Sequence, residues 1–261
     1  MAKKDLKDKK ILITGATGGF GREFTKQLLK HGAHLILTGQ NKAKLDELAG
    51  TFAGSSEGKI IGLISVNLDS AKGCEELYKK SLEITPDIDI LINNAGIIAY
   101  GGFHEVPMDT WQRLMEINLL SAMRLTYLFL PGMLKRKQGH IVLMSSVAGI
   151  VGTKKSAAYA ASKFGMRGFG LSLYGEVRTN GIDVTIIYPF WADTPILESP
   201  DYGINPTKKV IRMVVDEADD VIKESIKGIR RRKLFVYPGP AAKVISFLNR
   251  FVQIIGNQGK G

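Results

Sequence analysis

Short apolar, β-branched runs recur along the chain and predict strands. These runs are nearly continuous in apolar residues instead of alternating with polar ones, as in KILIT at 10–14 and HIVLMS at 140–145. Strands that helices cover on both faces have this pattern, because neither side meets water. The predicted strands are residues 10–14, 34–38, 59–65, 89–93, 140–145, 183–188 and 234–237.

Segments with the helical spacing of apolar residues separate these strands. The predicted helices are residues 21–31, 41–49, 71–84, 109–136, 157–178 and 216–228. A strand-helix-strand repeat pairs its strands in parallel through right-handed crossovers. The predicted fold is therefore α/β, a doubly wound parallel sheet of Rossmann type with about seven strands and helices on both faces.

The alternation runs without a repeat or a Pro/Gly/Ser-rich linker, which favours one domain over residues 1–240. It stops between Pro189 and Val215, where four prolines fall in a stretch without a clear element. Long irregular segments in compact domains are often lids or binding loops. A surface excursion with a short helix fits the same pattern, so the sequence leaves both interpretations open.

Residues 241–261 form a separate predicted tail. Val244, Leu248, Phe251 and Ile255 stand at i, i+4, i+7 and i+11, opposite a narrower polar side that includes Arg250. This spacing predicts an amphipathic helix. Such a helix can lie in a membrane interface, cover a partner subunit or cover its own domain, and the sequence alone leaves these three open.

The charge of the chain is uneven. The net charge is +11, and residues 223–261 hold nine Lys and Arg against one acid, most densely in IRRRK at 229–233. A basic run of this kind suits a solvated face, an anionic membrane or a nucleic acid. Nucleic acid is the least favoured partner, because neither a nucleic-acid motif nor interleaved aromatic residues accompany the run.

Composition favours a cytoplasmic protein, with peripheral membrane contact through the tail as a further possibility. A single cysteine, Cys74, excludes an internal disulfide and fits a reducing compartment. No uninterrupted apolar run reaches the about 18 residues of a membrane-spanning helix, and the charged start MAKKDLKDKK differs from a secretory signal. No spacing of His, Cys and Asp suggests a metal site.

A glycine-rich loop follows the first predicted strand. TGATGGFG, from Thr14, places Gly15, Gly19 and Gly21 at the start of a helix. Small residues let the backbone approach a pyrophosphate closely, and a helix N-terminus supplies free N–H groups. The strand-to-helix context predicts dinucleotide binding, with Thr17 and Phe20 as further contacts from the same loop.

The end of the second strand bears on the choice of cofactor. An acid there normally holds the ribose hydroxyl of NAD, whereas basic side chains suit the 2′-phosphate of NADP. This strand ends with Gln40 and Asn41, and Lys42 and Lys44 follow. Since no acid would repel a phosphate, NADP(H) is favoured over NAD(H).

The segment AYAASKFG, residues 158–165, places Tyr159 four residues before Lys163. On a helix these side chains share one face, with Cβ atoms about 5–6 Å apart. The pair is either structural or a proton donor beside the cation that tunes it. A free tyrosine has a pKa of about 10, and a nearby ammonium lowers that pKa by favouring the phenolate.

With the glycine loop, NNAG at 93–96 and SSVAG…YAASK, the chain resembles the short-chain dehydrogenase/reductase family from about Lys9 to Tyr237. The resemblance implies that Tyr159 is the general acid/base and that Lys163 holds the nicotinamide ribose. It implies that Ser146 polarises the substrate oxygen and that Asn118 keeps a water relay in place. Further cofactor contacts would come from Asn67, Leu68, Asn94, Ala95, Gly96, Pro189 and Thr194.

The chain departs from the family pattern at three positions. Phe190 stands where a glycine usually follows Pro189, and Asn67 stands where an aspartate is common near the adenine. Gly18 replaces the basic residue that NADP-dependent relatives often carry, which weakens the preference for NADP(H). We expect the amide of Asn67 to serve as well as the aspartate, because it can also hydrogen-bond an exocyclic amine.

These features predict an NAD(P)(H)-dependent oxidoreductase that transfers a hydride between nicotinamide and a secondary alcohol or ketone. Phe190 and Trp191, together with Ser146 and Tyr159, would line an apolar pocket suited to a small hydrophobic substrate, unless the apolar side chains only pack on one another. A non-catalytic dinucleotide-binding regulator or scaffold is the alternative. The resemblance also implies a homodimer or homotetramer formed mostly through helices 109–136 and 157–178.

Overall fold

Seven parallel strands form one sheet in the order β3-β2-β1-β4-β5-β6-β7. The computed structural model describes residues 4–54, 57–203 and 215–258. The strands are β1 (Lys10–Ile13), β2 (His34–Gly39), β3 (Lys59–Ser65), β4 (Ile90–Asn93), β5 (Gly139–Met144), β6 (Ile182–Ile187) and β7 (Phe235–Val236). The predicted fold class is confirmed, and each predicted strand is present with its ends shifted by at most a few residues.

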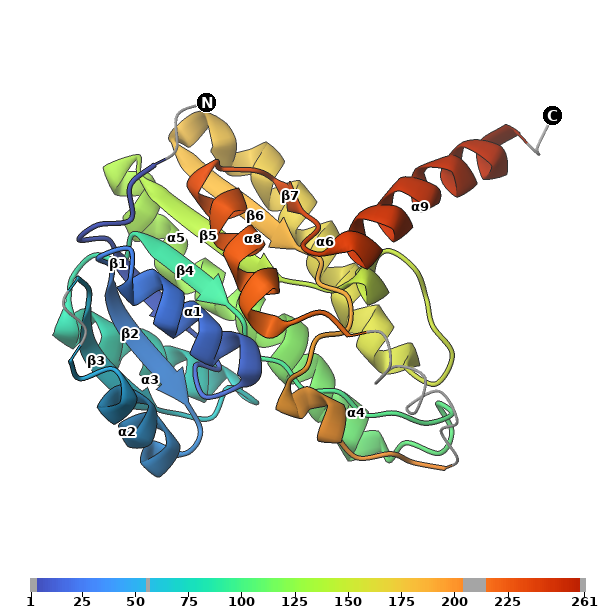
Figure 1. Ribbon diagram of the computed structural model, residues 1–261, viewed down its shortest axis with the longest axis horizontal. Coiled ribbons are helices and arrows are strands. Elements are labelled where there is room, and N and C mark those ends of the chain that lie inside the picture. Colours follow the sequence, from blue (N-terminus) through green and yellow to red (C-terminus); the bar gives the residue numbers. More distant parts are fainter. Residues whose placement is uncertain (1–3, 55–56, 204–214, 259–261) are drawn as a thin grey trace.

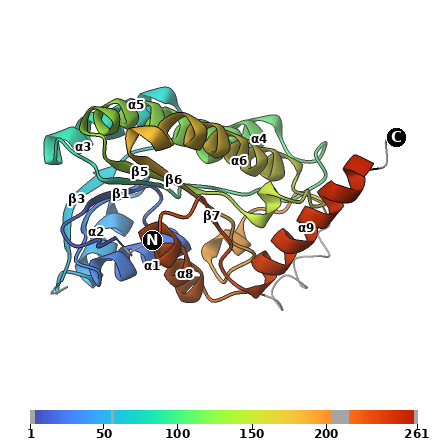
Figure 2. The same ribbon diagram turned by 90° about the horizontal axis from the view of Figure 1, so that it is seen from above.

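Helices cover both faces of the sheet, as Figures 1 and 2 show. One face carries α3 (Ala71–Ile84), α4 (Met108–Met115), α5 (Ser121–Arg136) and α6 (Ala157–Val177). The opposite face carries α1 (Gly19–Leu29), α2 (Lys42–Thr51) and α8 (Ala218–Arg230). This three-layer arrangement explains the apolar runs, because each strand lies between two layers of helices.

Side chains of successive strand residues pack into two different hydrophobic cores, one on each face of the sheet. Ile11 and Ile13 of β1 pack in the cluster that includes Phe24 of α1 and Ile222 of α8. Leu12, between them, packs in the cluster on the other side of the sheet. Side chains of a strand alternate between faces, so a strand buried on both sides needs an apolar residue at every position.

The long predicted helix 109–136 is continuous but irregular. A π-helical segment, η1 (Glu116–Leu120), joins α4 to α5. The stretch Met108–Arg136 is also the one helix among the described residues that is long and apolar enough on average to cross a membrane, and 44% of its apolar window is buried. Its α5 part packs against α3 and β5, so the apolar residues serve the core of the fold.

The segment after β6 contains little regular structure in its described part. A short 3-10 helix, η4 (Pro195–Glu198), lies within it. Isolated bridges pair Tyr100 with Asp201 and Ala192 with Asp216. The first bridge holds the segment against the loop that follows β4, and the second joins the two described ends of the segment. Residues 204–214 lie outside the described residues.

The predicted tail helix is present as α9 (Pro240–Gln258), which extends away from the sheet in Figures 1 and 2. Phe251 and Ile255 of the predicted apolar stripe lie where side chains are outside the described residues. The sequence interpretation separated a domain over residues 1–240 from a tail over residues 241–261. This boundary falls at the start of α9, and the division into domain and tail stays a prediction.

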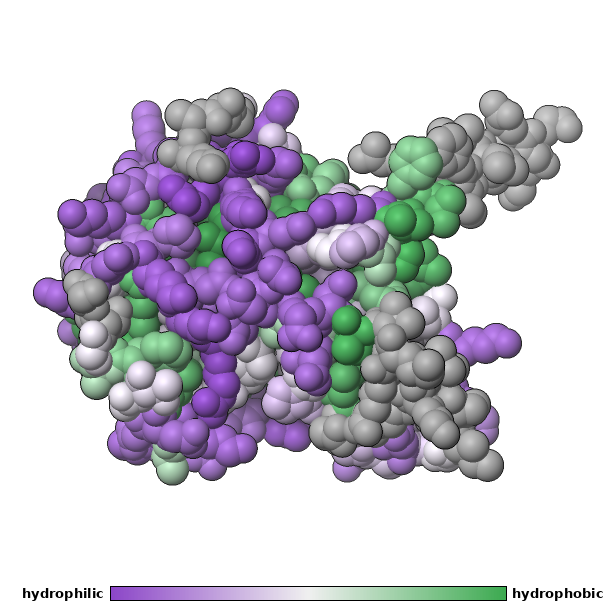
Figure 3. Space-filling view, viewed as in Figure 1, coloured by the Kyte–Doolittle hydropathy of each residue, from purple (hydrophilic) through white to green (hydrophobic). Residues whose placement is uncertain are grey.

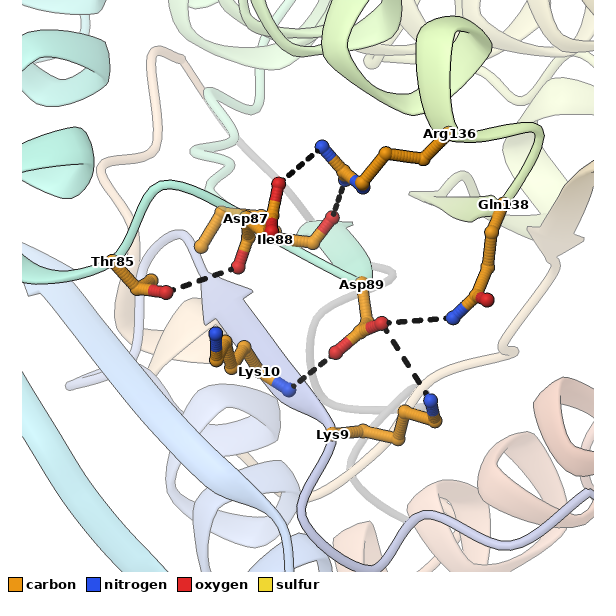
Figure 4. Close-up of polar contacts among 8 residues, drawn as sticks. All are labelled: Lys9, Lys10, Thr85, Asp87, Ile88, Asp89, Arg136 and Gln138. Atoms are coloured by element: carbon orange, nitrogen blue, oxygen red, sulfur yellow. Dashed lines mark hydrogen bonds and ion pairs between the residues drawn. The ribbon is translucent and has the colours of Figure 1, made fainter.

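A polar network closes the end of the sheet at which β1 and β4 begin (Figure 4). Asp89 accepts hydrogen bonds from the main-chain N–H of Lys10 at 2.9 Å and from Nε2 of Gln138 at 3.1 Å. Arg136, at the end of α5, donates to the carbonyl of Ile88 at 3.1 Å. These contacts fix the strand beginnings, and the glycine loop lies at the opposite end.

Candidate active site

Two adjoining cavities lie where β1, β4 and β5 end. The larger, here the outer cleft, has a volume of about 450 Å³. The smaller, here the inner pocket, has a volume of about 110 Å³. Both are lined by Phe20, Asn94, Gly96, Thr194 and Ile196, so one opens into the other. Because the strand order reverses between β1 and β4, this is the crevice in which doubly wound sheets bind ligands.

The structure brings most of the predicted site residues to these two cavities. Those on the outer cleft are Gly15, Thr17, Gly19, Phe20, Gln40, Asn41, Leu68, Asn94, Ala95, Gly96 and Thr194. Those on the inner pocket include Ser146, Tyr159, Lys163, Pro189, Phe190 and Trp191. Three predicted residues, Gly21, Asn67 and Asn118, line neither cavity.

The glycine loop has no room for side chains. Gly15 has a φ of +63°, and a Cβ there would lie 2.9 Å from Cα of Ala95. A Cβ on Gly19 would lie 2.5 Å from Cγ2 of Thr194, and one on Gly21 would overlap the carbonyl of Gly15. Gly21 therefore lets α1 pack closely against the end of β1, whereas Gly15 and Gly19 keep the cleft open.

The N-terminus of α1 faces the outer cleft without a side-chain cap. Gly18 is its N-cap, no side chain accepts a hydrogen bond from the first turn, and that turn holds no acid. Gly18, Gly19 and Phe20 line the cleft. The free N–H groups and the positive end of the helix dipole suit an anionic group such as a pyrophosphate.

Thr14, which the sequence interpretation did not include among the site residues, joins the two halves of the crevice. Its buried hydroxyl accepts hydrogen bonds from the main-chain N–H groups of Asn94 and Ala95, both at 2.9 Å. Nδ2 of Asn94 donates in return to the carbonyls of Thr14 at 2.9 Å and Gly15 at 3.1 Å. The sequence signal that could have identified Thr14 is its position directly before Gly15, at the start of the glycine-rich loop.

The predicted adenosine-side residues divide into cleft-lining and supporting groups. Gln40 lines the cleft, and its Nε2 donates to Oδ1 of Asn67 at 3.2 Å. Asn67 is exposed and lies outside the lining, so it supports Gln40. Asn41 caps α2 by accepting from the N–H of Lys44 at 3.1 Å. Lys44 lines the cleft, whereas Lys42 pairs with Asp46 at 2.7 Å.

Asn118 lies behind the site and is fully buried. Its Oδ1 accepts from the N–H of Ile97 at 2.8 Å, and its Nδ2 donates to the carbonyl of Ile97 at 2.9 Å. Nδ2 also lies 3.2 Å from Oγ of Ser162 on α6. The π-helical segment η1 carries this residue, and such segments often occur at functional sites. Asn118 thereby joins the loop after β4 to α6.

Tyr159, Lys163 and Ser146 meet in the inner pocket. Lys163 lies one turn after Tyr159 on α6, with Nζ 5.5 Å from the centre of the tyrosine ring. Its Nζ donates to the carbonyl of Met144, the last residue of β5, at 2.8 Å. Ser146 accepts from the N–H of Ala148 at 3.1 Å as the N-cap of η2 (Val147–Gly149). Strand β5 and helix α6 thus present the three groups together.

Burial dominates the protonation of this pair. It raises the pKa of Tyr159 to about 12, against a smaller lowering from the Ser146 hydroxyl. It lowers the pKa of Lys163 to about 8. The expectation that the ammonium lowers the pKa of the phenol is therefore wrong for this structure. Removal from water is the largest cause of both shifts, and the ammonium of Lys163 donates to the Met144 carbonyl.

The rest of the inner pocket is mostly apolar. Phe190 is half-buried and lines it, so the phenyl narrows the pocket at the position where the family has glycine. Trp191 also lines it and packs on Tyr100, with ring centres 5.9 Å apart. The remaining apolar lining is Ile98, Met144, Val147, Ala148, Ala192 and Ile196. No group of His, Cys and acidic residues within the described ranges has the arrangement of a metal site.

Two hydroxyl residues of the inner pocket had no sequence signal. Thr153 and Ser156 line it, and their hydroxyl oxygens lie 2.6 Å apart. Both lie between η2 and α6, where a single sequence holds no spacing that marks a ligand contact. Their place beside the pocket becomes visible only once η2 and α6 are packed together.

The chain matches a known enzyme family. Residues 9–202 match the family described as short chain dehydrogenase. Dehydrogenase/reductase SDR family member 7B of Mus musculus is 37% identical over 195 residues, which are 74% of this chain and 60% of that protein. An uncharacterized oxidoreductase of Staphylococcus saprophyticus is 30% identical over 199 residues, 76% of this chain and 85% of that protein.

A solved structure of another short-chain dehydrogenase shares the fold. The solved structure of a short-chain dehydrogenase from Sphingobium yanoikuyae in complex with NADPH has a TM-score of 0.80 and 25% sequence identity. The likeness covers 95% of each chain.

Proposed function

The chain belongs to the short-chain dehydrogenase/reductase family of NAD(P)-dependent oxidoreductases that act on alcohol and carbonyl groups, and we propose that it converts a lipophilic secondary alcohol and its ketone with Tyr159 as general acid/base. One observation carries the proposal. Tyr159, Ser146 and Lys163 line a single, mostly apolar pocket that opens into the cleft of the glycine loop.

The outer cleft fits a nicotinamide dinucleotide. Its glycines leave a cradle that a Cβ would fill, and the uncapped N-terminus of α1 suits the pyrophosphate. Gly96 lies between the cleft and Lys163, since a Cβ on it would be 3.7 Å from Nζ of Lys163. When bound, the nicotinamide supplies or accepts the hydride, and the protein orients the reactants around it.

Tyr159 has the protonation state that reduction requires. With a pKa of about 12, its phenol is neutral at physiological pH and can donate a proton to a carbonyl oxygen in the inner pocket. Oxidation needs the reverse step, in which the phenolate accepts a proton from the alcohol. The raised pKa therefore keeps Tyr159 in the acid form that ketone reduction uses.

Ser146 and Lys163 assist from either side of the tyrosine. The Ser146 oxygen accepts the N–H of Ala148, which leaves its own hydrogen to donate to the substrate oxygen as charge develops there. Lys163 donates to the Met144 carbonyl and has further ammonium hydrogens to offer toward a ribose at Gly96. Asn118 positions the loop after β4 through Ile97.

The lining supports a lipophilic substrate. Phe190 and Trp191 close the inner pocket with aromatic surface, and Ile98, Val147 and Ile196 are among the aliphatic side chains that line it. Its volume of about 110 Å³ accommodates the reacting part of a substrate. A bulky remainder would extend toward the segment that includes Ile196.

NADP(H) is the proposed cofactor over NAD(H), and Lys44 is the side chain that would meet the 2′-phosphate. It lines the cleft beside Gln40, and the part of the cleft formed by the described residues after β2 holds no acid. We expect Lys44→Ala to weaken NADPH binding about two- to fivefold, which corresponds to the free energy of one exposed ion pair. NADH binding should stay unchanged. Titration of both nucleotides measures this.

Lys42→Ala is the matched control, because Lys42 pairs with Asp46 and lies outside the cleft lining. It should leave both affinities unchanged. Equal effects of the two substitutions, or a preference of the wild type for NADH, would contradict the proposed role of Lys44.

The proposed assembly is a homodimer or homotetramer in the cytoplasm. The outer faces of α5 and α6 lie next to each other in Figure 2 and carry exposed Tyr127 and Phe164. Apolar side chains gathered on neighbouring helices favour contact between copies.

The cytoplasmic placement is supported by Cys74, which is buried and unpaired as in proteins of a reducing compartment.

Turnover with a graded series of ketones tests the proposed function. The series runs from small water-soluble ketones to large apolar ones, with NADPH and NADH supplied in turn and nucleotide oxidation followed by absorbance. We expect NADPH-dependent reduction whose kcat/KM rises with the apolar surface of the ketone. Nucleotide binding without turnover across the whole series would overturn the proposal.

A further inference from the structure

The first turn of helix α9 is packed against the rest of the fold. Ala242, in its first turn, is fully buried, and Nζ of Lys243 pairs with Glu224 of α8 at 2.9 Å. The helix then leads away from the body of the molecule, as two perpendicular views show (Figures 1 and 2). With 19 residues it is roughly 28 Å long at 1.5 Å per residue.

The described part of α9 presents an apolar face. Val244, Phe247 and Leu248 are 57%, 59% and 56% exposed. Their i, i+3, i+4 spacing places them on one side of the helix, and in Figure 3 hydrophobic residues gather around the root of α9. The sequence continues the stripe with Phe251 and Ile255, whose side chains lie outside the described residues.

This face adjoins the wall of the inner pocket. Helix α9 contacts η2, the short segment that follows Ser146. Val147 and Ala148 of η2 line the inner pocket, and Val151, just after η2, is 39% exposed. The apolar helix therefore begins beside the wall of the pocket that holds Tyr159.

The surrounding charge favours an anionic surface. Residues 223–261 hold nine Lys and Arg against one acid. Residues 240–261, which include α9, hold Lys243, Arg250 and Lys260 and no acid. A helix that combines an apolar face with a positive net charge is attracted to anionic lipid headgroups. A second copy of the chain would instead bring another net charge of +11.

We propose that α9 lies in the interface of an anionic lipid bilayer and holds the entrance of the inner pocket at the membrane surface. The substrate would then be a lipophilic alcohol or ketone that reaches the pocket from the bilayer. The docking surface is defined by the exposed Val244, Phe247 and Leu248 on a tail whose residues 240–261 carry basic residues and no acid. The substrate part of this inference rests on the proposed function, whereas the docking part does not.

Vesicle co-sedimentation of the full chain tests the docking. The vesicles contain either equal parts of phosphatidylserine and phosphatidylcholine or phosphatidylcholine alone. The wild type should sediment with the anionic vesicles, less so as salt is added, and much less with the neutral ones. The double variant Val244→Glu/Leu248→Glu should bind the anionic vesicles at least tenfold more weakly.

Leu82→Glu is the matched control. It places a single new glutamate at a 37% exposed leucine on α3, away from α9. It should sediment like the wild type, and circular dichroism checks that all variants fold. Absence of wild-type binding, or equal binding of the double variant, overturns the proposal. So does a fall in mass of the double variant in ultracentrifugation without a change in lipid binding, since a second copy would then cover α9.

Two kinetic assays separate this inference from the proposed function. With a water-soluble ketone and no vesicles, the double variant should match the wild type. With a ketone dissolved in anionic vesicles, its kcat/KM should fall in proportion to the lost binding. Vesicle binding with equal turnover of the membrane-dissolved ketone by both proteins would refute entry from the bilayer, while failure of both proteins on every ketone would refute the proposed function.

Discussion

Tyr159 and Lys163 show how burial decides the state of a site residue. Spacing on the helix predicted their common face, and the structure places both in the inner pocket. Spacing carries no information on desolvation, which raises the pKa of the phenol to about 12 and lowers that of the ammonium to about 8. Their positions could therefore be predicted from sequence, whereas their protonation could not.

His140 is the residue whose protonation links folding to pH. It is wholly buried on β5, its Nε2 lies 2.8 Å from the hydroxyl of Thr185, and burial lowers its pKa to about 4. Between about pH 4 and 6.5 the unfolded chain binds a proton that the folded chain does not. The free energy of unfolding should therefore fall as the pH drops through this window, by up to about 3 kcal/mol.

We expect His140→Gln to remove this contribution while keeping a side chain that can bond Thr185. Urea unfolding at pH 6.5 and pH 4.5 measures the change, with His104→Gln as the control at an exposed histidine. Loss of stability to the same extent in the wild type and in His140→Gln would show that another group carries the pH dependence.

At the scale of elements, the packing of η2 against α6 positions the site. Gly149, the last residue of η2, faces the helix so closely that a Cβ would lie 2.6 Å from the carbonyl of Lys163 and 2.6 Å from Oγ of Ser145. The hydroxyl of Ser145 itself donates to that carbonyl at 3.0 Å. The distance between Ser146 and Tyr159 thus depends on the absence of one methyl group.

Gly149→Ala should separate η2 from α6. We expect the free energy of unfolding to fall by about 1–3 kcal/mol, the usual cost of an overpacked contact, and kcat to fall with it. Gly152→Ala is the control, because its Cβ would meet nothing within 4 Å. Denaturant unfolding and turnover of both variants decide this. Wild-type stability and kcat in Gly149→Ala would mean that the contact does not position Ser146.

The elements also mark where sequence patterns stop being informative. Buried strands and capped helices such as α3 have local signals, and Ala71–Ile84 coincides with its predicted range. The π-helical segment η1 and the bridges Tyr100–Asp201 and Ala192–Asp216 join residues through tertiary packing. No pattern within one segment encodes such contacts, so the loop after β6 could be recognised only as irregular.

At the scale of the whole molecule, the strand order creates the site. The reversal between β1 and β4 brings the glycine loop and NNAG together, and Thr14 bonds one to the other. The family resemblance implied this arrangement. The direction in which α9 projects could not be predicted from the resemblance. Its amphipathic pattern was equally compatible with a membrane interface, a partner subunit and the chain's own domain.

The outer faces of α5 and α6 lead to a prediction about assembly. Tyr127 is 79% exposed on α5, and Phe164 is 41% exposed on α6. We expect Tyr127→Glu to shift the molecular mass in ultracentrifugation toward the monomer, because a charge there would have to be buried between copies. Leu82→Glu on α3 should keep the wild-type mass. A monomeric wild type would contradict the proposed oligomer.

The central claim is that Tyr159 transfers the proton in an NAD(P)(H)-dependent reaction, and single-turnover reduction of a ketone by Tyr159→Phe tests it most directly. The substitution removes only the phenolic oxygen from the buried ring. We expect nucleotide binding equal to that of the wild type and a rate lower by about 10²–10⁴-fold, the usual contribution of a general acid. A variant as fast as the wild type would show that Tyr159 does not transfer the proton.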